Sequence, residues 1–544
     1  MVMNKSEDRT KAIAESSLQQ KFPNIKDFLK VSCVTGYNIP ELTRQIQSQL
    51  SRMPHLLDKL PKRWIDIRDE LNARPENYID LRRYYKICAS HGMTNEQALF
   101  LSDYLHDLGT ILHFQRDPEL RKTVILKPEW ATNAVYALID SLKIQECSGK
   151  FKYFDLDEYW KASIYPAYKH YFLLRLMEKF ELCFKIADQD EYILPELLPA
   201  ERKDIDFTAF YLPRNLQLHY SYQFMPAGII TRFISRVHYL IRDQRYWKNG
   251  VELAFYDSSA LVESYSIQKR IRISVSGQSP LQLMAIIRSH LDHIHETLNM
   301  KKGKHVNEEI PCNCSVCIKS AEPYLYKLTL LEKMQSKGRD AFCERSGEDV
   351  SVQQLLEGFK PPQKTGNLFD TFITVVSQVQ GISKAIDTNE NSRNSVIALL
   401  LQTNGFRVKD QTLWSRSGSL TGEQIGELDI KIEDDNGRVV SIIEALNLYS
   451  VDAGRIDSHI LKLLEYDCTG VEENYILAYV SVKDFWTFCE KYQEHIASIK
   501  YGQYPLLPGL IEKEETGFQK IIGYCTRHKC NHGETRIHHI LVQM

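Results

Sequence analysis

The segment "LSDYLHDLGTILHFQRDPELRKTVILKPEWATNAVYALID" occupies Leu101–Asp140 and carries dense secondary-structure signals. The residue pattern of this segment predicts a helix, the strand TILHF, a turn at residues 116–118, the strand TVILK and a second helix beginning near Pro128. His113 falls on an apolar strand, where a histidine is usually a core residue with a hydrogen bond. We therefore expect a packed unit of helices and short strands around this segment, with Trp130 as a buried anchor.

The segment closely resembles the C-terminal-of-Roc (COR) domain of Roco proteins, where the same pattern follows a Ras-like GTPase domain. The matching residues are Asp107, Leu108, Gly109, Leu112, His113, Phe114, Pro128 and Trp130. Further along, "YILPELLPAE" (192–201) matches the end of the first half of COR, and "FMPAGIITRFISRVH" with "YWKNGVEL" (224–253) matches the second half. The resemblance implies an α+β scaffold that packs on a GTPase domain and forms a homodimer, with no catalytic residue of its own.

Upstream, "VMNKSED" and "VSCVTGYNIPELTRQIQSQL" resemble the last two guanine-recognition motifs of Ras-like GTPases. The resemblance implies that four residues contact guanine nucleotide: Asn4, Lys5, Ser32 and Cys33. Glu7 stands where the family has aspartate. The sequence holds no G-x-x-x-x-G-K-[S/T] loop to cradle phosphates. We therefore expect the C-terminal part of a longer protein, which binds GTP only with the missing part and does not hydrolyse GTP by itself.

Composition places the chain among globular proteins of several domains. It has 544 residues, 43% hydrophobic and 25% charged, with a net charge of −2. Any nucleic-acid surface must therefore be a local patch. No apolar run has the length of a membrane span, and the first residues lack the apolar centre of a signal peptide. We expect a cytoplasmic protein without a membrane partner. Kinase activity is excluded for this sequence, which has neither an H-R-D loop nor a D-F-G motif.

Four of the twelve cysteines are spaced as metal ligands rather than disulfide partners. "EEIPCNCSVCIKS" carries Cys312, Cys314 and Cys317, and Cys343 follows 26 residues later. A CxCxxC turn presents three thiolates to one ion, and four thiolates suit structural zinc. The alternative is that some are ordinary small buried residues. A second cluster near the C-terminus (Cys525, His528, Cys530 and His532) has no recognised spacing, and a terminal hairpin explains it equally well.

The last 180 residues predict the order helix, helix, strand, strand, strand, helix, strand. In "GELDIKIEDDNGRVVSIIEALNLYS" (426–450), Asp429 lies on an alternating strand and Glu444 within a continuous apolar run. A carboxylate is rarely buried without a partner or a metal. The order αβββαβ with these two acids resembles the restriction-endonuclease-like PD-(D/E)xK superfamily. The resemblance implies that Asp429 and Glu444 bind Mg²⁺ or Mn²⁺ beside a scissile phosphate.

The lysine of that motif would stand two residues after Glu444, where this chain has Leu446. Lys462 lies three residues after His459 on the next predicted helix, so both point to one side. We favour Lys462 as the catalytic lysine, and Lys431 is the second candidate. The alternative for both is an ordinary solvent-exposed lysine without a catalytic role. Glu390 is a candidate third acid, although a surface pairing with Arg393 also explains it.

Five regions follow: 1–53, the end of a Roc GTPase domain; 54–204 and 205–310, the two COR halves; 311–360, a cysteine-rich module; and 366–544, the nuclease-like domain. The fold class is α/β multidomain. The expected function is a COR dimerisation scaffold of a GTP-regulated Roco protein coupled to a metal-dependent nuclease. The alternative is a non-enzymatic scaffold with an inactive nuclease-like binding domain. The sequence leaves open whether DNA or RNA is the substrate.

Overall fold

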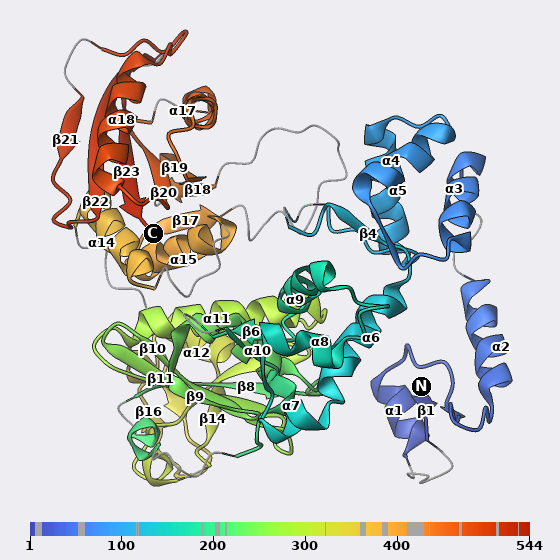
Figure 1. The fold of residues 1–544 in the computed structure, drawn as a ribbon. Helices are drawn as coiled ribbons and strands as arrows, with labels where there is room; N and C mark the ends of the chain where they lie inside the picture. The colour runs from blue at the N-terminus through green and yellow to red at the C-terminus, as the bar shows by residue number, and fades with distance from the viewer. Residues whose placement is uncertain are drawn as a thin grey trace. The chain divides into compact units, whose positions relative to one another are not determined.

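The computed structural model describes residues 1–5, 13–52, 60–115, 117, 119–186, 190–201, 207–212, 215–320, 322–359, 366–382, 390–410, 429–434, 436–466, 471–507, 511–530 and 533–544 (Figure 1). The chain divides into two compact units, Met1–Ala131 and Thr132–Met544. Both mix helices and strands, so the α/β multidomain class expected from the sequence is confirmed. Among the described residues no helix is both long and apolar enough to span a membrane.

The first unit begins with two short parallel strands and continues into a helical core. β1 (Val2–Met3) pairs with β2 (Leu29–Lys30), with α1 (Glu15–Lys21) between them and α2 (Ile39–Leu50) after them. The core elements are α3 (Lys62–Ala73), β3 (Tyr78–Asp80), α4 (Leu81–Ser90), α5 (Asn95–Asp107) and β4 (Thr123–Ile125). α5 opens with a capping box between Thr94 and Gln97. His113 is buried, with its ring nitrogens bonded to Ser102 and the Arg121 carbonyl, as predicted.

The helix predicted at Pro128 continues into the second unit, which begins at Thr132, and leads into a small antiparallel sheet. Its elements are α6 (Pro128–Ile139), α7 (Leu142–Glu146), β5 (Lys150–Lys152), α8 (Leu156–Tyr159), α9 (His170–Lys179), β6 (Phe184–Lys185) and β7 (Glu191–Ile193). The sheet order is β5-β7-β6. Trp160 is fully buried and donates its indole N–H to the Ala134 carbonyl at 2.9 Å, which fastens the segment to α6.

A seven-stranded sheet of order β14-β13-β8-β12-β11-β10-β9 forms the middle of this unit. Its strands are β8 (Leu216–Tyr222), β9 (Ile241–Trp247), β10 (Gly250–Phe255), β11 (Ser258–Tyr265), β12 (Arg270–Ser276), β13 (Val306–Pro311) and β14 (Leu325–Lys327). The helices are α10 (Ile229–Arg236) and α11 (Pro280–Thr297). Because β13 pairs with both β8 and β14, the segment that carries Cys312, Cys314 and Cys317 connects two strands of this sheet. The short elements α12 (Leu328–Gln335), β15 (Ala341–Phe342), β16 (Asp349–Val350) and α13 (Val352–Leu355) complete it.

The described elements of the C-terminal region begin in the predicted order, from α14 to β20, and continue with a further helix and three strands. Its elements are α14 (Leu368–Gly381), α15 (Glu390–Thr403), β17 (Arg407–Asp410), β18 (Ile430–Glu433), β19 (Val439–Leu448), α17 (Ala453–Tyr466), β20 (Glu473–Val480), α18 (Phe485–Ser498), β21 (Glu512–Glu514), β22 (Ile521–Cys530) and β23 (Gly533–Gln543). The sheet order is β17-β18-β19-β20-β23-β22-β21, with β19, β20 and β23 parallel. Residues 426–428, at the start of the strand predicted to carry Asp429, lie outside the described residues.

This sheet is covered on both faces by helices. Alternate strand residues such as Ile443 and Tyr475 share a hydrophobic cluster with α14 and α15, whereas Ile442 and Leu446 share another with α17 and α18. The first cluster also contains the core of the middle sheet and of α11, and α11 contacts α15. The Tyr256 hydroxyl donates to the Ser377 carbonyl at 3.2 Å. The middle sheet and the C-terminal sheet therefore share one continuous apolar core.

Candidate functional site

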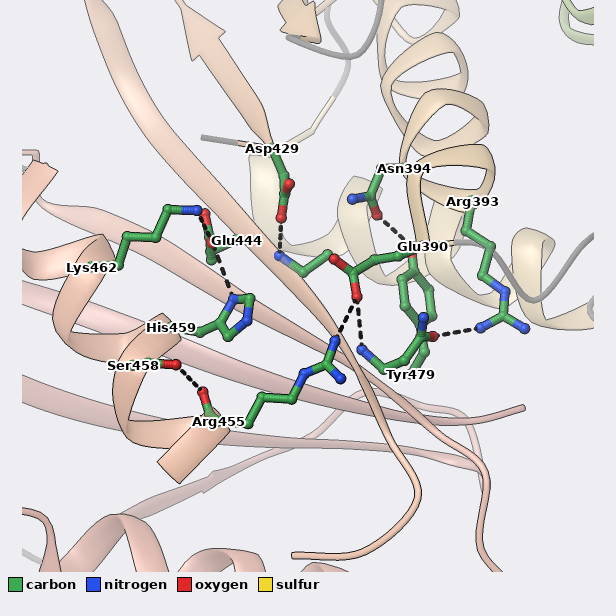
Figure 2. A network of polar contacts seen from close by, with 12 residues as sticks. Glu390, Arg393, Asn394, Asp429, Glu444, Arg455, Ser458, His459, Lys462 and Tyr479 are labelled. Atoms are coloured by element: carbon green, nitrogen blue, oxygen red, sulfur yellow. Dashed lines mark hydrogen bonds and ion pairs between the residues drawn. The ribbon is translucent and has the colours of Figure 1, made fainter. Parts of the chain in front are cut away.

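The candidate site lies where β18 and β19 separate. The described pairing of these strands ends at Ile430 opposite Ile443, so the next backbone N–H groups on that side of β19 need other partners. Carboxylates supply them: Asp429 Oδ2 accepts from Ala445 N at 2.7 Å, and Glu390 Oε2 accepts from Asn447 N at 2.9 Å (Figure 2). The end of the strand pairing thus fixes two acids in position.

Glu444 is the third acid and is fully buried. Its Oε1 is 2.5 Å from Lys462 Nζ and 3.1 Å from His459 Nδ1 (Figure 2). Its Oε2 is buried and has no hydrogen-bond partner among the described residues. An unsatisfied buried acceptor costs about 1–3 kcal/mol, and more when it is charged. The protein therefore keeps a carboxylate oxygen here that the fold itself does not require.

The electrostatics of the acids favour a cation. Burial, followed by the charge of Glu444, raises the pKa of Asp429 to about 7, although the Ala445 N–H and Lys462 act in the opposite direction. Burial likewise raises the pKa of Glu390. A positive charge between such groups restores their ionised forms, since opposite charge lowers a carboxyl pKa. The donor set is oxygen only, which suits Mg²⁺ or Mn²⁺.

Of the two candidate lysines, the structure brings Lys462 to the acids. It reaches Glu444 from α17, one turn beyond His459, as their spacing predicted. Lys431 lies on β18 opposite Ile442, and the ion pairs of Glu444 with described residues involve Lys462 and His459. Leu446, at the motif's lysine position, is buried in the α17 core. A lysine from the covering helix therefore stands beside the acid.

A buried polar layer holds α15 against β19, and the sequence did not reveal it. Arg393, interpreted as a surface partner of Glu390, is only 3% exposed and donates to Asn447 Oδ1 at 2.9 Å. That interpretation was wrong because the helix face carrying Arg393 packs on the sheet, over Tyr479. The Glu390 carboxylate is instead 3.4 Å from Arg455 (Figure 2). The sequence feature that could have indicated this layer is a set of polar residues at helical spacing, Glu390, Arg393 and Asn394.

Two clusters of three or more potential metal ligands occur among the described residues, with donor atoms within 4.8 Å of one another, and neither includes the site acids. One comprises Glu514, Cys525 and His538. The other is the predicted cysteine set, Cys312, Cys314, Cys317 and Cys343, all buried. Asp429 and Glu444 thus offer at most a two-carboxylate site, which is the number Mg²⁺ often uses when a substrate phosphate completes its shell.

The cysteine set is arranged as a ligand cradle. Cys343 Sγ is 3.7 Å from the sulfurs of both Cys314 and Cys317. The backbone N–H groups of Cys314 and Cys317 point at the sulfurs of Cys312 and Cys314, each at 3.4 Å. Burial opposes a thiolate at Cys343, yet hydrogen bonds from Ser346 and the backbone lower its pKa to about 6. Four converging sulfurs with N–H donors match the needs of a tetrahedral thiolate site.

The other predicted positions are placed as follows. Asn4 Oδ1 accepts from the Cys33 N–H at 3.1 Å, joining the ends of β1 and β2, while Ser32 is buried beside them and Lys5 has a φ of 56°. Cys525 and His528 lie on opposite faces of β22 and do not share a site. His528 bonds to the Tyr504 carbonyl and to Thr526. The Cys530 side chain and His532 lie outside the described residues.

Comparison with known families identifies most of the chain between residues 61 and 358. Residues 61–198 match the family "C-terminal of Roc, COR-A domain", and residues 213–358 match "C-terminal of Roc, COR-B domain". The COR-B match includes all four clustered cysteines.

The chain is similar to several larger proteins. A Roc-COR-CHAT protease of Runella zeae is 24% identical over 322 residues, which is 57% of this chain and 34% of the protease. A probable serine/threonine-protein kinase pats1 of Dictyostelium discoideum is 24% identical over 336 residues, 58% of this chain and 10% of that protein. The structure of Methanosarcina barkeri Roco2 RocCORdC bound to GDP shows 30% identity over 36% of this chain and 62% of that chain, with a TM-score of 0.30. The chain spans about a third of the length of the protease and a tenth of the length of pats1.

Proposed function

This chain is a COR-domain protein related to the Roc-COR proteins, and on that premise we propose that its C-terminal domain is a metal-dependent nuclease carried by the COR scaffold. The observation that carries the proposal is Glu444, buried in the sheet with Lys462 on one oxygen and no partner for the other among the described residues. The element order α15-β17-β18-β19-α17-β20 supports a restriction-endonuclease-like fold.

The roles follow from position. Asp429 and Glu444 would hold Mg²⁺ or Mn²⁺, which supplies charge neutralisation and an activated water to phosphodiester hydrolysis. Lys462 would place its ammonium where negative charge grows on the phosphate. Glu390 caps Asn447 N and is paired with Arg455, so it positions the strand end without binding the ion directly. His459 keeps the Glu444 carboxylate oriented.

A non-enzymatic binding domain is the second candidate. The relatives differ in the activity named for them, protease in one and kinase in another, so similarity to them does not assign an activity to the C-terminal domain of this chain. A metal site that binds nucleic acid without cleaving it would keep the acids but not depend on Lys462. The effect of replacing Lys462 therefore distinguishes the two candidate functions.

The deciding experiment is a cleavage assay with Mg²⁺ or Mn²⁺ on single-stranded DNA, double-stranded DNA and RNA. Asp429→Asn, Glu444→Gln and Lys462→Ala should each lower the rate about a hundredfold or more, since each loses transition-state charge stabilisation. Lys431→Ala is the matched control and should cleave at the wild-type rate. Metal-dependent cleavage that survives Asp429→Asn and Glu444→Gln rejects the site. Binding without cleavage by the wild type favours the second candidate.

The scaffold carries three further proposals. We propose that Cys312, Cys314, Cys317 and Cys343 hold a structural zinc ion, because their four sulfurs converge without leaving an open position. We propose that COR-B mediates a homodimer, and that Asn4, Lys5, Ser32 and Cys33 face the guanine base when a full Roc domain is present. The Asn4–Cys33 hydrogen bond supports the last of these, since it joins the two motifs.

A further inference from the structure

A second cluster of potential ligands lies at the opposite edge of the C-terminal sheet. Glu514 on β21, Cys525 on β22 and His538 on β23 each offer a donor atom within 4.8 Å of the other two. Strand register puts them on one face, because Cys525 lies opposite His538 and Glu514 lies opposite Gly523. The missing side chain at Gly523 leaves room there: a Cβ atom would be 3.0 Å from the Glu514 Cβ.

The cluster contains several polar atoms that the fold leaves unsatisfied. Glu514 Oε2, His538 Nε2 and the Tyr475 hydroxyl are buried without a hydrogen-bond partner among the described residues. Tyr475 stacks on His538 with ring centroids 4.9 Å apart. The hydrogen bond found for the Cys525 thiol is a long one of 3.9 Å to the Thr526 carbonyl. Each buried polar atom without a hydrogen bond lowers the stability of the fold by about 1–3 kcal/mol. Three such atoms at one place therefore indicate a common partner.

The chemistry of the donors selects the partner. A thiolate, an imidazole and a carboxylate are the three ligand types that zinc accepts, and thiolate with carboxylate neutralises a divalent ion. The His538 Nδ1 to Glu514 Oε1 distance of 2.7 Å orients the imidazole ring. Tetrahedral zinc sets its donors roughly 3–4 Å apart, so small side-chain movements within the 4.8 Å cluster suffice.

We propose that Glu514, Cys525 and His538 bind a zinc-class divalent ion, separate from the site acids and from the four clustered cysteines. The ion ties β21, the three-residue edge strand, to the β22–β23 hairpin beneath α14, whose Phe369 contacts the His538 ring at a centroid distance of 5.3 Å. Three protein ligands leave a fourth position for water or the Tyr475 hydroxyl.

The test is the zinc content of the full chain, purified under reducing conditions from zinc-supplemented cells. Wild type should carry one more equivalent than Cys525→Ser and one more than Glu514→Gln, both near-isosteric changes that preserve packing. Cys489→Ser is the matched control: this buried thiol on α18 belongs to the same domain, and its loss should leave the content unchanged. Because the readout is a difference between variants, it does not depend on whether the four-cysteine site is filled.

Cobalt adds a second readout. Co²⁺-loaded wild type should show a thiolate-to-cobalt absorption band. Cys525→Ser should lose the part of this band that comes from the Glu514, Cys525 and His538 site, and Cys343→Ser should lose the part that comes from the four-cysteine site. Hydrogen exchange should also show β21 opening faster in Cys525→Ser than in Cys489→Ser. Equal zinc contents in wild type, Cys525→Ser and Glu514→Gln would overturn the proposal, as would an unchanged cobalt band in Cys525→Ser.

Discussion

Changing Asp429 to asparagine should stabilise the metal-free C-terminal sheet at neutral and alkaline pH. Burial and Glu444 raise the pKa of Asp429 from 3.8 to about 7, so the folded state disfavours the ionised carboxyl group. For a pKa raised by folding, stability is fully present below the unfolded pKa and is lost as pH rises to the folded pKa. The loss should therefore develop between about pH 4 and pH 7.

The magnitude follows from the shift. About three pKa units at 1.36 kcal/mol each set an upper limit of about 4 kcal/mol at pH 8. Solvent reaches part of the group, so we expect about 2 kcal/mol, which is roughly a thirtyfold change in opening equilibrium. Asparagine keeps the acceptor for the Ala445 N–H, so the variant retains that contact.

Hydrogen exchange of β19 peptides in EDTA at pH 5 and pH 8 measures this, after correction for intrinsic exchange rates. It reports the local opening of a multidomain chain, for which a single melting temperature is ill defined. The β19 amides of Asp429→Asn should be better protected from exchange than those of wild type, and this difference should be larger at pH 8 than at pH 5. In a separate experiment without EDTA, added Mg²⁺ should increase the protection of wild type but not of the variant. Asp434→Asn, in the exposed turn of the same hairpin, is the control: hydrogen bonds lower the pKa of Asp434, so its difference from wild type should stay constant. A constant difference for Asp429→Asn as well would refute the reasoning.

Four further predictions concern the rest of the chain. Cys343→Ser should remove one zinc equivalent and unfold the β13–β16 segment while the C-terminal sheet keeps its hydrogen-exchange protection, and an unchanged metal content would contradict the zinc assignment. Gly250→Ala should destabilise the β9–β10 hairpin by roughly 2–4 kcal/mol, because the new Cβ would be 2.3 Å from the Trp247 ring; urea unfolding with tryptophan fluorescence would measure it. The purified chain should release no phosphate from GTP, and measurable turnover would overturn that expectation. Light scattering at micromolar concentration should give the mass of a dimer, whereas a monomer mass would argue against COR-B as the dimer contact.

The C-terminal elements could be predicted because their sequences carry clear periodicity. The run VVSIIEAL predicts a buried strand, and His459 with Lys462 predicts one helix face, which the structure places at Glu444. The cluster of Glu514, Cys525 and His538 could not be predicted, because it depends on the pairing register of three strands. Arg393 was misread for a related reason: whether a helical arginine is exposed depends on the tertiary packing of its face, not on its spacing from Glu390.

The site acids show the same limit. The sequence gives two acids on neighbouring strands but not the bonds of Asp429 and Glu390 to backbone N–H groups, which arise where the strand pairing stops. The cysteine spacing predicted four converging sulfurs, which the structure shows, but not their place on the COR-B sheet. That placement depends on the long-range pairing of β13 with β8.

The continuous core of COR-B and the C-terminal sheet bears on how such a protein can change over evolutionary time. A gene fusion that exchanged the residues after 366 for another domain would leave the α15-facing surface of α11 open to water, and an excised C-terminal fragment would expose the matching apolar surface. Replacing the C-terminal domain therefore also disturbs the packing of α11, and is not a change confined to a linker. In lineages with different C-terminal domains, the residues of α11 should co-vary with the domain that packs on them.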